Sequence, residues 1–262
     1  MASLAPLAAR WPWPRVALLT AIALAMWTLK RHYAMAGVDD LGWILKPVAR
    51  LTSLLSGARF EWEAGAGYLS RERFFLLAKP CAGVNFLLAA MALVGFLLSE
   101  RAVTWRASAG LMAITVGTAY AATIVANTTR IVIALSLLAH PLATGLWTAA
   151  RIHRLEGVAV YFAWLMVLHF AVARFARGYE AMTKVFRGTR LPLICYYFVT
   201  ILVPLANGAG YASRSFLEHI AFVVLIPPTL VGVVATVRLT VRASARIRVP
   251  AARGNVSTQR PA

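Results

Sequence analysis

The chain has 262 residues, of which 60% are hydrophobic and 14% charged, and its 27 Lys and Arg against 9 Asp and Glu give a formal net charge of +18. Soluble domains are about 45–50% apolar and about 25% charged, so this composition excludes an ordinary soluble domain and indicates a membrane protein. The basic residues stand between long uncharged runs, which argues against a nucleic-acid partner. Cys81 and Cys195 are too few for a disulfide framework, and no close Cys or His pairs suggest zinc, so no metal or cofactor is predicted.

Six runs, uncharged except for Glu156 in one of them, are long enough, or nearly so, to cross the roughly 30 Å hydrocarbon core of a bilayer as helices. They cover residues 16–29, 81–98, 108–126, 155–173, 191–206 and 220–237. The sequence therefore predicts an all-α fold, a polytopic membrane bundle of about six transmembrane helices. The basic start of the chain and the triplet at 34–36 also fit a cleaved secretory signal, but a retained first span is the preferred interpretation.

A seventh run, 131–150, is uncharged but is interrupted by His140-Pro141 and by Gly145. It could cross the membrane, or it could be a re-entrant or interfacial segment that returns to the same face. Counting Lys and Arg on the two sides does not decide between these topologies.

The chain is expected to form a single membrane domain, 1–262, with four parts. A loop at 30–80 carries a surface helix near 41–55, where Trp43, Ile44, Val48 and Leu51 follow helical spacing. A core at 81–173 is followed by a pair of helices at 191–237. A basic tail at 238–262, which contains arginines and no acidic residue, is expected to lie in the cytoplasm and contact anionic lipid.

The segment Lys79-Pro80-Cys81-Ala82-Gly83 precedes the second run. Proline suits the first turn of a helix, so Cys81 is predicted at a helix N-terminus, where unpaired N–H groups and the helix dipole favour a thiolate. Gly83 would leave the neighbouring backbone open to another chain. The alternative is that Cys81 is a small apolar residue in a membrane helix, as Cys195 is expected to be.

Two further motifs carry polar residues at the ends of apolar runs. Arg130, three residues after Asn127, has apolar sequence on both sides and is costly there unless it faces protein, water or a partner. His153 and Glu156 are three residues apart, which puts them on one helix face, so Glu156 could orient the imidazole. The alternatives are a snorkelling arginine for Arg130, and for the other pair a structural histidine and a helix-capping glutamate.

Cys-Ala-Gly at 81–83, Asn127-x-x-Arg130, and His153 with Gly157 resemble, in this order, the exosortase and archaeosortase family. The segments Cys-Ala-Gly-Val-Asn-Phe and His-Arg-Leu-Glu-Gly are most similar to the exosortase K subgroup. The resemblance covers about residues 75–175.

The resemblance implies a cysteine transpeptidase of the bacterial inner membrane with its active site on the extracytoplasmic face. Cys81 would be the nucleophile, His153 the proton shuttle and Arg130 the group that stabilises the transition state. The substrates would be membrane-anchored proteins whose C-terminal sorting signal consists of a short motif, one transmembrane helix and a basic cluster. It also implies that 131–150 does not cross, because a crossing would separate Cys81 from His153 by a bilayer.

Two other functions remain open. A protease would use the same cysteine with water as the acceptor. A non-catalytic transporter or assembly scaffold would instead place polar residues near the bilayer midplane, and His169 and the Pro227-Pro228 pair favour it.

Overall fold

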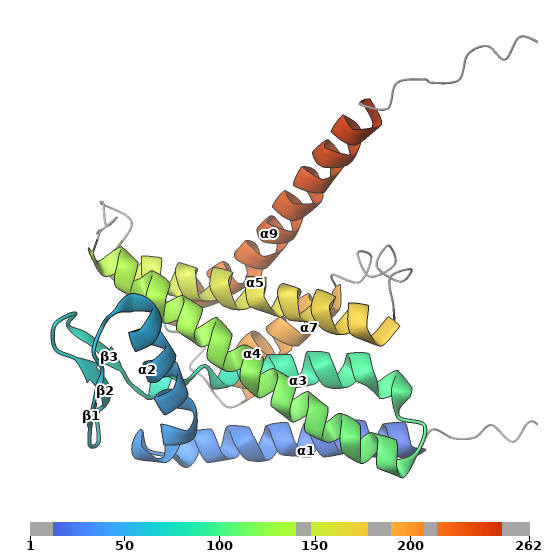
Figure 1. Cartoon of the computed structure of the whole chain (residues 1–262), viewed down its shortest axis with the longest axis horizontal. Coiled ribbons are helices and arrows are strands. Elements are labelled where there is room, and N and C mark those ends of the chain that lie inside the picture. Colours follow the sequence, from blue (N-terminus) through green and yellow to red (C-terminus); the bar gives the residue numbers. More distant parts are fainter. Residues whose placement is uncertain (1–12, 140–147, 178–189, 207–213, 248–262) are drawn as a thin grey trace, which may run out of the picture.

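The computed structural model describes residues 13–139, 148–177, 190–206 and 214–247, and these residues are mainly helical (Figure 1). The α-helices are α1 (Trp13–Met35), α2 (Gly42–Ser56), α3 (Val84–Leu98), α4 (Trp105–Ala139), α5 (Ala149–Arg177), α7 (Arg190–Tyr197), α8 (Val203–Ala206) and α9 (Arg214–Ile247). Three segments are long and apolar enough to cross a membrane, namely Lys79–Arg101, Trp105–Leu138 and Arg151–Ala176. This finding agrees with the membrane protein predicted from composition.

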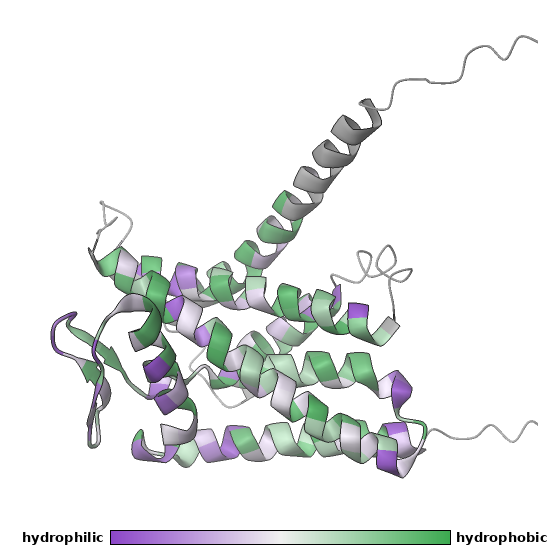
Figure 2. Ribbon diagram, in the orientation of Figure 1, coloured by the Kyte–Doolittle hydropathy of each residue, from purple (hydrophilic) through white to green (hydrophobic). Residues whose placement is uncertain are grey.

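Helix α3 is the centre of the bundle. It packs against α1, α4, α5 and α7, and 78% of its apolar segment is buried, against 28% for α4 and 39% for α5. In Figure 1, α1, α3 and α5 run nearly parallel while α4 crosses them obliquely. Hydrophobic residues extend along the bundle, and hydrophilic ones gather toward its two ends (Figure 2). Apolar burial around α3 therefore holds together the helices that carry the candidate site.

The limits of the helices differ from those of the predicted spans. Beyond the three long segments, the structure has α1 and two shorter apolar helices at Arg190–Leu202 and Ile220–Val233. Residues 131–139 continue α4 without a break, so this part of the expected re-entrant segment is an extension of the third span. The His140-Pro141 pair, Gly145 and the last part of the basic tail lie outside the described residues.

A small cap, residues 37–77, covers one end of the bundle (Figure 1). It contains a 3-10 turn, η1 (Asp39–Leu41), helix α2, and an antiparallel sheet of β1 (Glu61–Glu63), β2 (Gly67–Ser70) and β3 (Phe75–Leu77) in the order β1-β2-β3. The register pairs Trp62 with Tyr68 and Tyr68 with Leu77. An all-α fold was therefore an incomplete prediction, because these strands of three or four residues, one of them fully exposed, show no clear alternation of apolar and polar residues.

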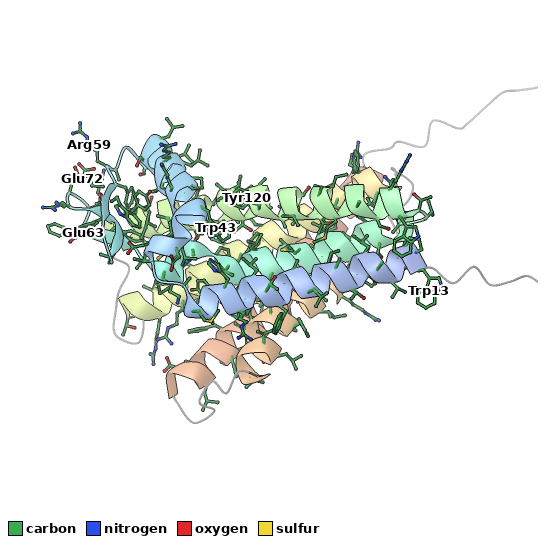
Figure 3. All side chains as sticks on the ribbon, turned by 90° about the horizontal axis from the view of Figure 1, so that it is seen from below. Trp13, Trp43, Arg59, Glu63, Glu72 and Tyr120 are labelled. Carbon is green, nitrogen blue, oxygen red and sulfur yellow. The ribbon has the colours of Figure 1, made fainter. Side chains whose placement is uncertain are left out.

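Helix α2 corresponds to the surface helix predicted near 41–55, and it packs across α4. The Tyr120 hydroxyl donates to the carbonyl of Trp43 at 2.7 Å, and the two rings stack with centroids 6.0 Å apart (Figure 3). Ile44, Leu45 and Val48 are buried on the same helix. The apolar residues at helical spacing in 41–55 thus form a face of α2 that is covered partly by protein.

Candidate active site

Cys81 lies in a tight 3-10 turn, η2 (Lys79–Ala82), between β3 and α3. Its backbone N–H donates to the carbonyl of Ala78 at 2.8 Å, and its half-buried Sγ lies 4.0 Å from the carbonyl oxygen of Leu76. Gly83 follows with φ +71° and caps α3, which begins only at Val84. Cys81 therefore lies at the N-terminal end of the Lys79–Arg101 segment, as predicted, but in a 3-10 turn that a left-handed glycine separates from α3.

Lys79 contacts the end of α1 and the residues that follow it. Its Nζ donates to the carbonyl oxygen of Ala36 at 2.7 Å and lies 5.1 Å from the centroid of the Tyr33 ring. Tyr33 in turn donates to the carbonyl of Lys79 at 3.2 Å. These contacts attach the cysteine turn to the C-terminal end of α1.

Asn127 and Tyr161 connect the cysteine turn to α4 and α5. The Asn127 side-chain amide donates to the carbonyl oxygen of Cys81, and the Tyr161 hydroxyl donates to the Asn127 Oδ1 at 2.8 Å. Asn127 is fully buried, so its polar atoms depend on these partners. The Tyr161 ring also packs on Phe86, with centroids 5.3 Å apart.

Arg130 is the centre of the site. Its guanidinium donates to the Tyr161 hydroxyl at 3.3 Å and to Nε2 of His153 at 2.8 Å. The Cys81 thiol lies within electrostatic reach of the same guanidinium. Arg130 was expected to end the third span, but α4 continues past it for more than two turns. The cost of a charge between apolar residues is offset here by partners from other helices.

The contact between Arg130 and His153 assigns the imidazole tautomer. A guanidinium has only donors, so Nε2 must accept, and the neutral ring carries its proton on Nδ1. That Nδ1 lies 3.6 Å from Oε2 of Glu156, and Arg130 Nε lies 3.9 Å from the same oxygen. The carboxylate thus faces both the imidazole and the guanidinium, which suits a role in orienting the histidine.

The Glu156 side chain is buried, with an exposed fraction of 6%. Among the residues that the structure describes, neither of its oxygens nor Arg130 Nε has a hydrogen-bond partner. Leaving such groups unpaired costs about 1–3 kcal/mol each, more when charged. The ion pairs of Glu156 with Arg130 and His153, at 3.9 and 3.6 Å, offset part of this cost.

Two glycines leave the space that these side chains occupy. A Cβ on Gly83 would lie 3.3 Å from both Asn127 Cγ and the Tyr161 hydroxyl. A Cβ on Gly157 would lie 3.0 Å from Arg130 Nε. At both glycines, side chains of the site therefore lie directly against the backbone.

All six residues singled out in the sequence are placed near one another: Cys81, Gly83, Asn127, Arg130, His153 and Glu156. No hydrogen bond joins the Cys81 thiol to His153, although both residues are within the described part of the chain. Cys195 is buried on α7 and belongs to the hydrophobic core. Within the described residues, no group of three or more His, Cys, Asp or Glu side chains could hold a metal ion.

Tyr161 is the site residue that sequence reasoning missed. It lies two helical turns after His153 and one turn after Gly157, so helical spacing places it on the same face of α5. That spacing was available in the sequence. Nothing else distinguished this tyrosine from the other aromatic residues of an apolar helix.

Comparisons with protein-family models, with curated proteins and with solved structures found no match for this chain. The chemistry of the site must therefore be inferred from its own residues.

Proposed function

We propose that the chain is a membrane cysteine transpeptidase or protease, similar to the exosortases, that processes the C-terminal sorting signal of exported proteins. The observation that carries the proposal is the convergence of three distant motifs on Arg130. Its guanidinium contacts His153 directly and reaches the Cys81 turn through Tyr161 and Asn127. A thiol, an imidazole and a fixed cation together are the groups that acyl transfer needs.

In the proposed reaction, the Cys81 thiolate attacks the carbonyl carbon of a peptide bond close to the membrane anchor of the substrate. The C–S bond forms, the C–N bond breaks, and the departing amine takes up the proton released from the thiol. Water or an amine then attacks the resulting thioester, gives its proton to His153, and restores the thiolate. Arg130 stabilises the negative charge that develops on the carbonyl oxygen in both steps.

The hydrogen bond from Arg130 to His153 must break before this chemistry can begin. In the structure Nε2 of His153 accepts a hydrogen bond from the guanidinium, so this nitrogen cannot accept a proton from the thiol at the same time. We infer that a substrate carbonyl draws the guanidinium away from the histidine. Glu156, 3.6 Å from Nδ1, would then stabilise the imidazolium that forms.

The proposal includes a location and a topology. The chain would lie in the bacterial inner membrane with six spans, and the cap and the site would be on the extracytoplasmic face. The substrates would be membrane-anchored proteins that end in a transmembrane helix and a basic cluster. The basic residues that follow 237 would contact anionic lipid on the cytoplasmic side.

The experiment that tests the activity is co-expression with a tagged candidate substrate that ends in an apolar helix and a basic cluster. Wild type, Cys81→Ala, His153→Ala and Cys195→Ala would be compared by immunoblot and by the mass of the new C-terminus. Loss of cleavage in Cys81→Ala and His153→Ala, with cleavage retained in Cys195→Ala, is the expected result. The mass separates hydrolysis from transfer to an amine.

A non-catalytic scaffold or transporter is the second candidate, and the absence of a direct contact between Cys81 and His153 within the described residues favours it. It predicts that a substrate cleaved in cells that carry the wild type is also cleaved in cells that carry Cys81→Ala. It also predicts that iodoacetamide alkylates Cys81 no faster below neutral pH than an ordinary exposed thiol.

A further inference from the structure

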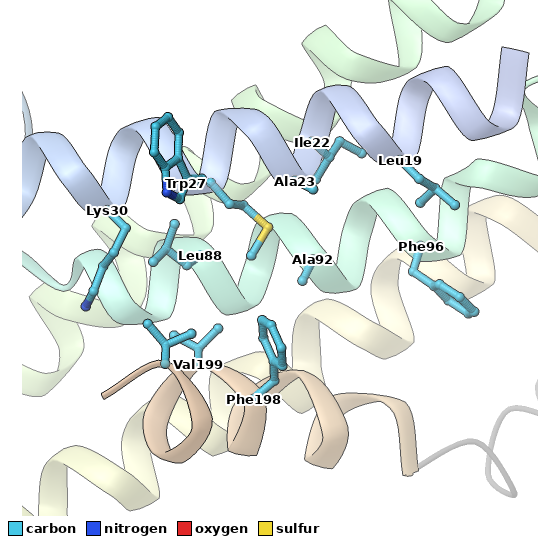
Figure 4. A pocket seen from close by; sticks show the side chains of 12 residues that line it. Leu19, Ile22, Ala23, Trp27, Lys30, Leu88, Ala92, Phe96, Phe198 and Val199 are labelled. Carbon is cyan, nitrogen blue, oxygen red and sulfur yellow. The ribbon is translucent and has the colours of Figure 1, made fainter. Parts of the chain in front are cut away.

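An apolar groove of about 420 Å³ lies on the side of the bundle, between α1, α3 and the π-helix η6 (Phe198–Leu202) (Figure 4). This volume is within the range of ligand pockets, about 300–1,000 Å³. Helix α1 contributes Leu19 and Met26, α3 contributes Leu88 and Ala92, and η6 contributes Val199. A π-helix widens one turn of a helix and occurs often at functional sites, and here it forms one wall of the groove.

The groove opens toward the surroundings of the bundle. Three of its large apolar side chains are about half exposed: Trp27, Phe96 and Phe198. Such a surface is unfavourable in water and is suited to contact with lipid chains. The groove is therefore accessible from the hydrocarbon that would surround these helices.

Among the described residues that line the groove, Lys30 is the single charged one. Its Nζ donates to Asn85 Oδ1 at 2.9 Å and lies 5.8 Å from the centroid of the Tyr33 ring. Neither partner carries a negative charge, and no ion pair joins Lys30 to a carboxylate among the described residues. The ammonium thus gives one end of an otherwise apolar groove a positive charge that favours an anion.

The dimensions of the groove match one leaflet of a bilayer. Leu19 and Lys30, which line it on α1, are about 16 Å apart at 1.5 Å per residue. The hydrocarbon core is about 30 Å thick, so this length is about half of it. The Lys30 end lies at the same end of the bundle as Cys81, because Asn85 belongs to the first turn of α3.

We propose that this groove binds one acyl chain of an anionic phospholipid from the leaflet that faces the cap, with the lipid phosphate at Lys30. The proposal goes beyond the proposed function and does not require any cleavage activity. The positive end of the groove and its length of one leaflet favour a phospholipid over an uncharged apolar segment of a protein.

The test is native mass spectrometry of the purified full-length chain in detergent, with phosphatidylglycerol and with phosphatidylcholine as probes. Phosphatidylglycerol is expected to bind preferentially. Lys30→Gln should weaken its binding about fivefold, the effect of one lysine close to an anionic lipid, and Ala23→Phe, which fills the groove from α1, should weaken it at least as much. Lys46→Gln, at an exposed site on α2, and Ala21→Phe, at an exposed site on α1, are the matched controls and should leave binding unchanged.

Four outcomes would overturn the proposal. Equal binding of the two lipids would show that the charge of Lys30 selects nothing. Full competition by soluble glycerol phosphate would assign Lys30 to a free anion rather than to a lipid. If Ala23→Phe and Ala92→Phe both retain phosphatidylglycerol, each with an unchanged unfolding midpoint, the lipid binds elsewhere. If an apolar peptide helix displaces the lipid from the wild type, the groove belongs to a protein segment.

Discussion

Tyr161, on α5, contacts residues of both α3 and α4. Its hydroxyl donates to Asn127 and accepts from Arg130, while its ring packs on Phe86. Removing the hydroxyl leaves the ring in place but frees both polar partners. Tyr161 is therefore a positioning residue for the arginine and for the cysteine turn.

Tyr161→Phe is expected to lower the rate of processing by a factor of about ten to a hundred, because small misplacements of catalytic groups have effects of this size. The loss should fall on kcat, with KM little changed, and the unfolding midpoint should stay close to that of the wild type. Tyr197→Phe is the control, because the hydroxyl of this tyrosine donates to the carbonyl of Val224, away from Arg130 and Asn127. An unchanged kcat in Tyr161→Phe would contradict the positioning role.

Gly157→Ala separates stability from activity. In a helix, alanine is favoured over glycine by about 1 kcal/mol, but at this position the new Cβ would lie 3.0 Å from Arg130 Nε. We expect a stability equal to or above that of the wild type, together with a loss of processing of about tenfold. The measurements are thermal unfolding in detergent and the co-expression assay.

Gly117→Ala is the matched control for this variant, because nothing lies within 4 Å of a Cβ on that glycine of α4. It should gain stability without losing activity. Equal activity in both glycine variants would show that the position of Arg130 is not critical.

The site residues differ in how far the sequence could predict them. His153 and Glu156 share a helix face by their spacing alone, and the structure has them on one face of α5. That Arg130 meets His153 could not be predicted from either residue, because it depends on how α4 and α5 pack. Hydropathy indicated only that a charge inside an apolar helix must have a partner.

At the scale of elements, α1 and α3 are in close contact at Gly95. A Cβ there would clash with Cδ1 of Ile22, which is buried. Gly95→Ala should therefore destabilise the protein by about 1–3 kcal/mol, the usual cost of overpacking. Unfolding midpoints in detergent would measure the loss, and Ile22→Ala in the same chain should recover part of it. If the two substitutions act additively, the close contact is not the cause.

The sequence predicted the long elements and those with regular apolar spacing better than the short ones. The apolar spacing in 41–55 was sufficient to predict α2, and long apolar runs were sufficient for α3 and α5. The end of α4 was misjudged because Arg130 was read as a boundary, whereas the helix passes through it. The sheet in the cap was not foreseen, because its register depends on contacts between segments and not on a pattern within any one strand.

At the scale of the whole molecule, the cap and the turn between α3 and α4 lie at opposite ends of the bundle (Figure 1). If the site faces the outside, Glu63→Cys in β1 should react with an impermeant maleimide in intact cells, and Thr104→Cys should react only after permeabilisation. Both positions are exposed, and both variants would carry Cys81→Ala and Cys195→Ala to remove other thiols. The reverse pattern would place the site in the cytoplasm, and labelling of both in intact cells would contradict a membrane-spanning bundle.

Helix α4 is 35 residues long, which corresponds to about 52 Å at 1.5 Å per residue. It is therefore much longer than the roughly 30 Å of hydrocarbon, and a long helix adapts to a bilayer chiefly by tilting. Its oblique path across α1 and α3 is visible in Figure 1. If α4 spans a membrane as proposed, a thinner or thicker bilayer is expected to change its tilt and to move the Arg130 guanidinium relative to its partners on α5. Bilayer thickness would then be a mechanical variable of the proposed reaction, and the surrounding lipids would be part of the scaffold that aligns its groups.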